Sequence, residues 1–425
     1  MPSYHPASAL RDHLKPFLRC LGAWPARRLL AAATGMLQSG SSVLSEGCRA
    51  VDGGSITTWV WKVSQLLQRL PWDGLLARHD HRLRQRQKHW HLIAHDTTAI
   101  PKPWAQTMEG LSTVHDGCSG ELVNGYTLCV SVGVGKGSWN LHPIRTTLIN
   151  PKAEDFRSQN SELQRHLSAM LAAGIGLDCL HVFDRGFDDE KQFHFLDGRR
   201  ISWMIRLKDN RTVTFRGEQH RITVVADTIL RERPMARDGI VYGRSDIGIE
   251  ITHDAQGKKI PLETRTYVLV AVQRPQYEKP MLLLQNGLVR HPKEVLQAYL
   301  DYLDRWEVEN GIRLWKQTVS PAQVQLMTVP RIQGLLNLQV LLVDFLLREH
   351  EQGHDPFGNG LWETLQRRYL HAGETLKQSP YVVARAVRDL LREDRMRAPQ
   401  HLGTSPSSST VQLLLLPQPL DTVCI

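Results

Sequence analysis

The sequence contains no C-x-x-C pair, which argues against a cysteine-based zinc site. Its cysteines are few and scattered along the chain: Cys20, Cys48, Cys118, Cys129, Cys179 and Cys424. Such spacing is also unlike the dense disulfide frameworks of small secreted domains. We therefore expect free thiols that pack as small apolar side chains, in a protein of a reducing compartment.

Long hydrophobic runs are also missing. The most apolar run, Val340 to Leu347, is short and contains Asp344, whereas a membrane-spanning helix needs about 20 consecutive apolar residues. The amino terminus has no signal-peptide pattern, because Arg11 and Lys15 stand where an apolar segment would be required. We expect a cytoplasmic protein with no membrane partner and with access to chromosomal DNA.

Positive charge is present in excess and is concentrated at one end of the chain. Residues 1–90 hold 13 Lys and Arg against 5 Asp and Glu, so this segment carries +8 of the formal net charge of +9. The apolar fraction of 41% and the charged fraction of 22% are typical of a folded globular protein. A basic amino-terminal segment before a near-neutral body indicates either a solvated surface or a module that binds nucleic acid.

Hydrophobic periodicity divides the chain into four regions. Residues 1–88 predict a helical domain, in which a short helix, a glycine turn and a longer helix are compatible with a DNA-binding helix-turn-helix. Residues 89–347 predict a mixed α/β sheet with helices on both faces and a β-rich insertion at about 209–290. Residues 348–397 predict a helical tail, and the Pro- and Ser-rich residues 398–425 predict a disordered end.

The core of the predicted sheet follows from one run of elements. The expected order is a strand at 91–100, a hairpin of strands at 126–134 and 139–149, a helix at 158–173, a strand at 177–183, a helix at 188–196 and a strand at 201–207. Asp188 is the expected cap of the second of these helices. After the insertion, residues 291–316 predict a helix, and residues 321–347 predict a largely apolar core helix.

Two aspartates occupy positions that suit a ligand site. Asp96 stands at or near the end of the first predicted strand, and Asp184 closes the apolar strand that begins at Leu180. A charge at the end of an apolar strand must be solvated, paired or bound to a metal. Strand ends are also where ligands bind in open α/β sheets. For each aspartate taken alone, a turn or a helix cap is the more common role, by about two to one.

A third carboxylate belongs to a row of functional side chains. If residues 291–316 form one helix, Tyr302, Arg305, Glu309 and Lys316 fall within an arc of roughly 60° on one face. A carboxylate flanked by two cations and a phenol suits a metal ion beside a phosphate group. The alternative is a salt-bridged surface helix, although Arg305 and Glu309 form the one i, i+4 ion pair of this row.

The spacing Tyr-x2-Arg-x3-Glu-x6-Lys at 302–316 resembles the signature of a branch of the DDE transposases of bacterial insertion sequences. Asp96 in His-Asp-Thr-Thr and Asp184 in Phe-Asp-Arg-Gly-Phe resemble the motifs that hold the first and second catalytic aspartates of that family. The resemblance covers roughly residues 90–345. It implies a ribonuclease-H-like fold with a β insertion before the glutamate-bearing helix. It also implies metal-dependent cleavage at transposon ends and strand transfer into target DNA, through a hairpin at the transposon end.

The resemblance also implies a site and its partners. Asp96, Asp184 and Glu309 are expected to hold two Mg²⁺ ions, with Mn²⁺ as a substitute. The residues expected to contact DNA phosphates surround these carboxylates: Tyr302, Arg305, Lys316, Arg206, Lys208 and Arg185. The expected partner is double-stranded DNA, both the terminal inverted repeats and the target. Two ends must be joined together, so a homodimer is expected on DNA.

Three other readings remain open at this point. An inactive or repurposed DNA-binding protein of transposase descent would keep the fold without cleavage. Another metal nuclease of the same fold would leave the Tyr-Arg-Glu-Lys row unexplained. A zinc protein could use His89, His91 and His95, which lie on one face of a strand.

Overall fold

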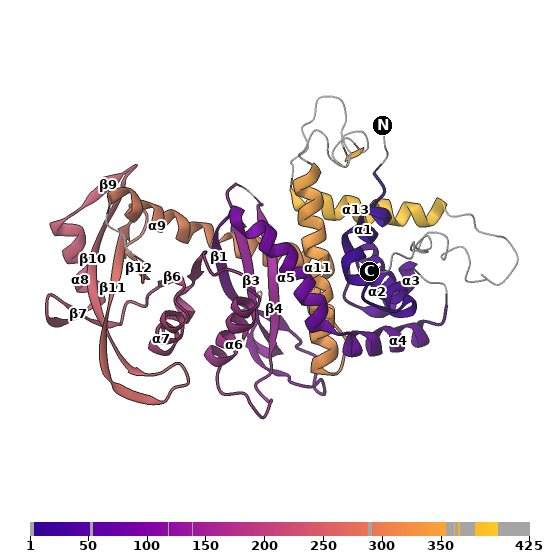
Figure 1. The fold of residues 1–425 in the computed structure, drawn as a ribbon, viewed down its shortest axis with the longest axis horizontal. Helices are drawn as coiled ribbons and strands as arrows, with labels where there is room; N and C mark the ends of the chain where they lie inside the picture. Colours follow the sequence, from indigo (N-terminus) through magenta and orange to yellow (C-terminus); the bar gives the residue numbers. More distant parts are fainter. Residues whose placement is uncertain are drawn as a thin grey trace, which may run out of the picture. The chain divides into compact units, whose positions relative to one another are not determined.

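The computed structural model describes residues 4–51, 54–117, 119–137, 139–287, 291–353, 361, 364, 365 and 379–397 (Figure 1). The chain forms two compact units. Unit 1 comprises residues 1–81, 99–126 and 312–425, and unit 2 comprises residues 82–98 and 127–311. Within its described residues unit 1 is mainly helical, whereas unit 2 is built on a sheet.

The helices of unit 1 come from both ends of the chain. They are α1 (Pro6–Leu18), α2 (Ala23–Ser39), α3 (Leu44–Val51), α4 (Ile56–Arg69), most of α5 (Trp72–Arg86), most of α10 (Glu307–Val319), α11 (Val329–Gly353) and α13 (Pro380–Arg397). The same unit contains β2 (Ser112–His115), which pairs antiparallel with the first residues of β3 (Leu122–Gly135). The prediction that the amino-terminal region is helical is confirmed.

Glycines allow the helices of unit 1 to approach closely. A Cβ atom on Gly35 of α2 would lie 2.6 Å from the carbonyl oxygen of Gly47 on α3. A Cβ atom on Gly334 of α11 would lie 2.3 Å from the carbonyl oxygen of Leu67 on α4. Both distances are too short for any larger residue, so these two helix contacts depend on glycine.

Helix α11 is a core helix with an unusual composition. Its segment Val329–Gln352 is long and apolar enough to cross a membrane by composition, so the expectation that no such stretch exists was wrong. However, 78% of its most apolar window is buried inside the protein. Gln339 accepts a hydrogen bond from the Trp315 indole and donates one to the Ser42 hydroxyl. These partners are those of a helix buried within a protein core, as the sequence predicted.

The sheet of unit 2 is mixed. Its strands are β1 (Trp90–Pro101), β3, β4 (Leu141–Ile149), β5 (Leu180–Phe183), β6 (Ser202–Arg206), β7 (Thr212–Phe215), β8 (Glu218–Arg221), β9 (Met235–Arg237), β10 (Ile240–His253), β11 (Lys259–Gln273) and β12 (Met281–Gln285). The hydrogen-bonded order is β4-β3-β1-β5-β6-β12-β11-β10-β7-β8, with β9 on β10. β5 pairs parallel with β1 and β6, and β3 pairs antiparallel with β4.

Burial explains why β5 is a central strand. Its sequence Leu-His-Val-Phe is largely buried on both faces, and parallel strands need cover on both faces. On one face, Phe183 belongs to a single buried cluster with Ile93, Trp203 and Leu167. Helices α6 (Gln159–Ala172), α7 (Glu190–Gly198) and α8 (Ile222–Glu232) contribute to this cluster, while α9 (Pro292–Asp304) packs against β10 and β11.

Most predicted elements of the sheet are confirmed, with two corrections. Asp188 does not cap α7; Asp189 does, by accepting a hydrogen bond from the Lys191 amide. Asp188 is buried instead, because its carboxylate pairs with Arg211 and accepts a hydrogen bond from the Lys208 amide. The insertion is β-rich as predicted, but it also contains α8, a helix that the sequence analysis did not assign.

The two units divide the chain at points other than the predicted domain boundaries. Residues 99–126 and 312–353 group with the amino-terminal helices rather than with the sheet. The functional boundaries at 88 and 347 stay predictions. The predicted disordered end at 398–425 lies outside the described residues, as does most of the segment 354–378. Of the described cysteines, Cys48, Cys129 and Cys179 are buried thiols outside any disulfide, as expected, and Cys20 is exposed.

Two helical glycines of unit 1 test the importance of close packing. We expect Gly334→Ala to lower the free energy of unfolding by about 1–3 kcal/mol, because the added methyl group overlaps the Leu67 carbonyl. Gly74→Ala should be neutral or raise that free energy by up to ~1 kcal/mol, since nothing lies within 4 Å of its Cβ position. Urea unfolding of both variants measures this. Equal stability of the two proteins would contradict the glycine argument.

Candidate functional site

The pairing of β1 with β5 brings two aspartates to neighbouring positions. His95 is the register partner of Phe183, and the next residue along each strand is Asp96 or Asp184. Paired strands lie about 4.8 Å apart. Asp184 ends its strand as predicted, whereas β1 continues to Pro101 after its pairing with β5 has ended. Both carboxylates therefore lie where the parallel pairing stops.

A single guanidinium connects Asp96 with Glu309. The Nη1 atom of Arg305 lies 3.5 Å from a carboxylate oxygen of Asp96, and its Nη2 atom lies 3.3 Å from one of Glu309. The Arg305 side chain is almost fully buried, with 6% of its surface exposed, whereas Asp96 is 18% and Glu309 is 35% exposed. These three charged residues and Asp184 all belong to unit 2.

The segment that carries Arg305 is a break between two helices. α9 ends at Asp304 and α10 (Glu307–Val319) begins three residues later. The prediction of one continuous helix face through residues 302–316 was therefore wrong. Asn310 and Gly311, which have low helix propensity, lie inside α10, and the chain turns instead at Arg305 and Trp306. This turn allows Arg305 and Glu309 to share a site without lying on the same helix.

The other two members of the predicted row have different surroundings. The Tyr302 ring is buried, and its centroid lies 5.5 Å from the guanidinium carbon of Arg305. Lys316 falls in unit 1, where its ammonium group donates a hydrogen bond to the carbonyl of Ala99. The structure thus brings Tyr302 to Arg305, and a phosphate-binding role of Lys316 stays a prediction.

Three further predicted DNA contacts lie on the elements that follow Asp184. Arg185 comes directly after Asp184, and 56% of its side chain is exposed. Arg206 is half-buried at the end of β6, and Lys208 is exposed two residues later. The Lys208 amide donates a hydrogen bond to Asp188, which holds this segment in place. Their contact with DNA stays a prediction.

The electrostatic environment of Asp96 reflects the convergence of charges. Burial raises the pKa of Asp96 to about 6. Arg305 acts in the opposite direction, while Asp184 and Glu309 raise the pKa further. Asp184 and Glu309 therefore lie close enough to Asp96 to affect its charge, so the three predicted ligands lie in the same part of unit 2. Their negative charge exceeds the one positive charge that Arg305 supplies.

The three carboxylates offer the oxygen ligands that a hard divalent cation requires, but their oxygens are too far apart to bind one ion together. Carboxylate oxygens are the ligands that Mg²⁺ prefers. In this structure the oxygens of Asp96, Asp184 and Glu309 do not all lie within 4.8 Å of one another. The guanidinium of Arg305 lies between two of them instead. A cation can therefore be held by all three only if these side chains move closer together.

The histidine-based zinc alternative finds no support in the arrangement of the side chains. Both ring nitrogens of His95 are hydrogen-bonded, one to Ser131 and one to His181. His91 lies 2.8 Å from Asp304 and forms a close group with that residue and Asp301. This group explains His91 as the partner of a carboxylate rather than of two other histidines.

One neighbour of the site was missed by the sequence analysis. Trp306 occupies the break between α9 and α10, and 53% of its surface is exposed. Its ring centroid lies 5.6 Å from the guanidinium carbon of Arg305. An exposed indole can stack on a nucleobase. The available signal was a large aromatic residue directly after the arginine of the predicted row.

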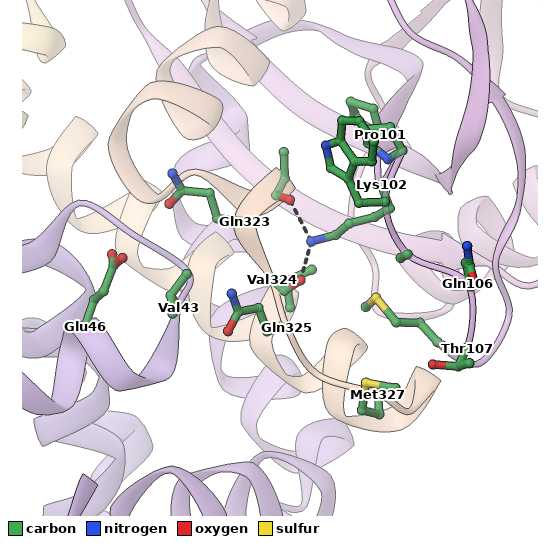
Figure 2. A pocket seen from close by; sticks show the side chains of 15 residues that line it. Val43, Glu46, Pro101, Lys102, Gln106, Thr107, Gln323, Val324, Gln325 and Met327 are labelled. Atoms are coloured by element: carbon green, nitrogen blue, oxygen red, sulfur yellow. Dashed lines mark hydrogen bonds between the residues drawn. The ribbon is translucent and has the colours of Figure 1, made fainter. Parts of the chain in front are cut away.

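A cavity of about 790 Å³ in unit 1 is separate from this chemistry. It is lined by Lys102, Trp104, Met327 and residues near them (Figure 2). The Lys102 ammonium group donates hydrogen bonds to the carbonyls of Ala322 and Val324, as Figure 2 shows. Burial lowers the pKa of Lys102 to about 8. Because its ammonium is committed to backbone carbonyls, Lys102 stabilises a loop rather than binding an anion.

The chain has little detectable similarity to characterised proteins. No model of a known protein family matches it, and neither does any curated protein. Among solved structures, it is similar to a piggyBac transposase in a synaptic complex with hairpin DNA, with 10% sequence identity and a TM-score of 0.46. That similarity covers 99% of this chain and 87% of the other. The function of this chain must therefore be argued from its own residues.

The raised pKa of Asp96 predicts a stability change with a definite sign. Its folded-state pKa of about 6 exceeds the ordinary value of 3.8, so ionisation of Asp96 destabilises the metal-free fold as pH rises from about 4 to about 6. We expect Asp96→Asn to raise the free energy of unfolding at pH 8 by about 1–3 kcal/mol, and to leave it nearly unchanged at pH 4.

Urea unfolding in EDTA at the two pH values measures this difference. Asp178→Asn is the matched control, because Asp178 is an exposed aspartate of the same unit. It should change stability little at either pH. A destabilised Asp96→Asn protein at pH 8 would contradict the view that this site holds uncompensated negative charge.

Proposed function

We propose that this protein is a DDE transposase that cuts DNA at transposon ends and joins them to target DNA. The observation that carries the proposal is the convergence of Asp96, Asp184 and Glu309 around the Arg305 guanidinium. The three carboxylates come from distant parts of the sequence, and a structural ion pair would need only one of them. Three carboxylates around one buried cation instead form a set of oxygen ligands for metal ions.

The strand order supports a ribonuclease-H-like catalytic domain. In chain order, the first five strands of unit 2 are β1, β3, β4, β5 and β6, and they occupy the order β4-β3-β1-β5-β6 in the sheet. An antiparallel pair β3–β4 on one side of β1 and parallel strands on the other is the arrangement expected of that fold. The insertion of β7 to β12 precedes the glutamate-bearing α10, in line with the insertion-sequence branch of the family.

We assign the metal-ligand role to Asp96, Asp184 and Glu309, with two Mg²⁺ ions as the cofactor and Mn²⁺ as a substitute. When bound, these ions supply Lewis acidity for in-line displacement at phosphorus. The carboxylates must be ionised to hold a cation. Asp96 therefore has to lose a proton that it holds with a pKa of about 6 in the metal-free protein. Cleavage should for this reason weaken at acidic pH.

The remaining residues of the site position the DNA. Arg305 carries a buried positive charge beside the ligands, and its planar guanidinium suits the non-bridging oxygens of a phosphate. Arg185 and Lys208 are exposed on the elements that follow Asp184 and can bind the backbone on either side. The nucleophile is water for cleavage and a DNA 3′-hydroxyl for joining. No covalent protein–DNA intermediate is needed, and a hairpin at the transposon end is the intermediate we expect.

Recognition of the terminal inverted repeats is proposed to lie in the amino-terminal helices. The segment 1–90 carries most of the net positive charge, and such charge binds phosphates in a salt-dependent manner. Helices α3 and α4 follow each other as in the predicted helix-turn-helix pattern. We further propose that two copies assemble on paired DNA ends, and that the protein acts in the cytoplasm on chromosomal DNA.

Cleavage of a labelled duplex tests the proposal. The substrate carries the inverted repeat that flanks the gene, and the reaction is run in Mg²⁺, in Mn²⁺ and in EDTA. We expect Asp184→Asn and Glu309→Gln to lower the cleavage rate more than ~100-fold, because loss of even an outer-shell partner of a metal ligand typically costs 10–100-fold. DNA affinity should stay within about threefold of the unmodified protein, because neither carboxylate contributes to binding phosphates.

The same assay separates the alternative function. Asp178→Asn is the control and should cleave at the normal rate, since Asp178 is exposed and is not one of the three converging carboxylates. Specific binding of the repeat without cleavage in either metal would identify an inactive or repurposed DNA-binding protein. Undiminished cleavage by Asp184→Asn would remove the catalytic assignment.

A further inference from the structure

A continuous chain of hydrogen bonds crosses the core of unit 2 and ends next to the candidate ligands. It links side chains of β4, α6, β3, β1 and β5 and a carbonyl of the loop before β5, in the order Thr147, His166, Ser131, His95, His181 and Gly176. The successive donor–acceptor distances are 2.7, 2.7, 2.7, 2.9 and 2.8 Å. His95 directly precedes Asp96, so the chain holds the strand that presents this carboxylate.

When the three histidines are neutral, donors and acceptors can be assigned along this series of hydrogen bonds in one way only. The carbonyl of Gly176 can only accept, so the Nε2–H group of His181 donates to it. The Nδ1 atom of His181 must then accept from the Nε2–H group of His95. By the same reasoning, Ser131 donates to the Nδ1 atom of His95 and accepts from the Nε2–H group of His166.

The last link completes this arrangement without an unpaired ring nitrogen. The Nδ1 atom of His166 accepts from the hydroxyl of Thr147. A proton added to any of the three rings would turn an acceptor into a donor and break a link. Burial lowers the pKa of His95, and it lowers the pKa of His181 to about 4 and that of His166 to about 3, which agrees with three neutral rings.

These hydrogen bonds help to fix the register of β1 on β5. β1 and β5 pair through apolar residues, including Leu92, Ile93 and Val182. Apolar contacts have no direction, so they distinguish poorly between neighbouring registers when both faces of a strand are buried. The bond from His95 to His181 excludes a shift of one residue, because that shift would turn one of the two rings to the opposite face.

We propose that His95 is a positioning residue that sets the register of β1 on β5 and thereby places Asp96 beside Asp184 for cation binding. This inference rests on the proposed function of these two carboxylates. The His95 ring touches neither of them. It acts through the strands, with its partner His181 three residues before Asp184 and its own place one residue before Asp96.

The test uses the full chain and Mn²⁺ as the probe. His95→Leu removes both hydrogen bonds of the ring, whereas His95→Gln keeps one acceptor and one donor. We expect the dissociation constant for Mn²⁺ to rise about tenfold or more in His95→Leu and to stay within about threefold in His95→Gln. Leu167→Ala is the control, because it removes a fully buried side chain of α6 and lowers stability without touching the chain of hydrogen bonds.

Hydrogen exchange of the metal-free proteins supplies a second readout. Amides of residues 92–95 and 180–183 should lose protection selectively in His95→Leu, and not in Leu167→Ala at matched global stability. Ser131→Ala, which changes no atom of β1 or β5, should cause a smaller loss at the same amides. This variant keeps the test decisive if His95→Leu does not fold.

The outcomes separate the two proposals. Selective loss of both protection and Mn²⁺ affinity supports the positioning role. If the unmodified protein binds no Mn²⁺, the proposed function is overturned. Selective loss of protection in the His95→Leu variant of that protein would still support the register role. Unchanged exchange and unchanged Mn²⁺ affinity in a folded His95→Leu protein overturn the positioning role.

Discussion

The register of β1 on β5 is the constraint on which the candidate site depends. Because His95 lies opposite Phe183, the strand pairing ends at Asp96 and Asp184 together. A slip of one residue would separate these carboxylates and turn apolar side chains away from their partners. Apolar burial on both faces stabilises the sheet, while the buried histidines add the directional contacts that burial does not provide.

A cluster of carboxylates destabilises the folded protein electrostatically. Burial and the two neighbouring acids raise the pKa of Asp96 to about 6, and the Arg305 guanidinium acts against them. Such an arrangement is unfavourable for stability alone, since a buried charge requires a matching partner. Bound cations, as we propose for this site, would offset this unfavourable term.

The break between α9 and α10 is also locally unfavourable but brings functional side chains together. It interrupts a helix at Arg305 and Trp306, whose amides bond to carbonyls three residues earlier instead of four, with poorer geometry than in an α-helix. In return, the guanidinium reaches Asp96 and Glu309 at once, and the indole beside it faces solvent. Local irregularity of this type is typical of sites where side chains must converge on a ligand.

The sequence alone determined what depends on local pattern and residue type. Periodicity predicted the amino-terminal helices, the hairpin of β3 and β4 and the strand that ends at Asp184, and the chemistry of carboxylates singled out Asp96 and Glu309. The tertiary structure decided the rest. Helical spacing could not reveal the break at Arg305, because the interactions that favour it come from distant strands. The sequence also could not predict the hydrogen bonds among the histidines, because these bonds join residues 35 and 86 positions apart in the chain.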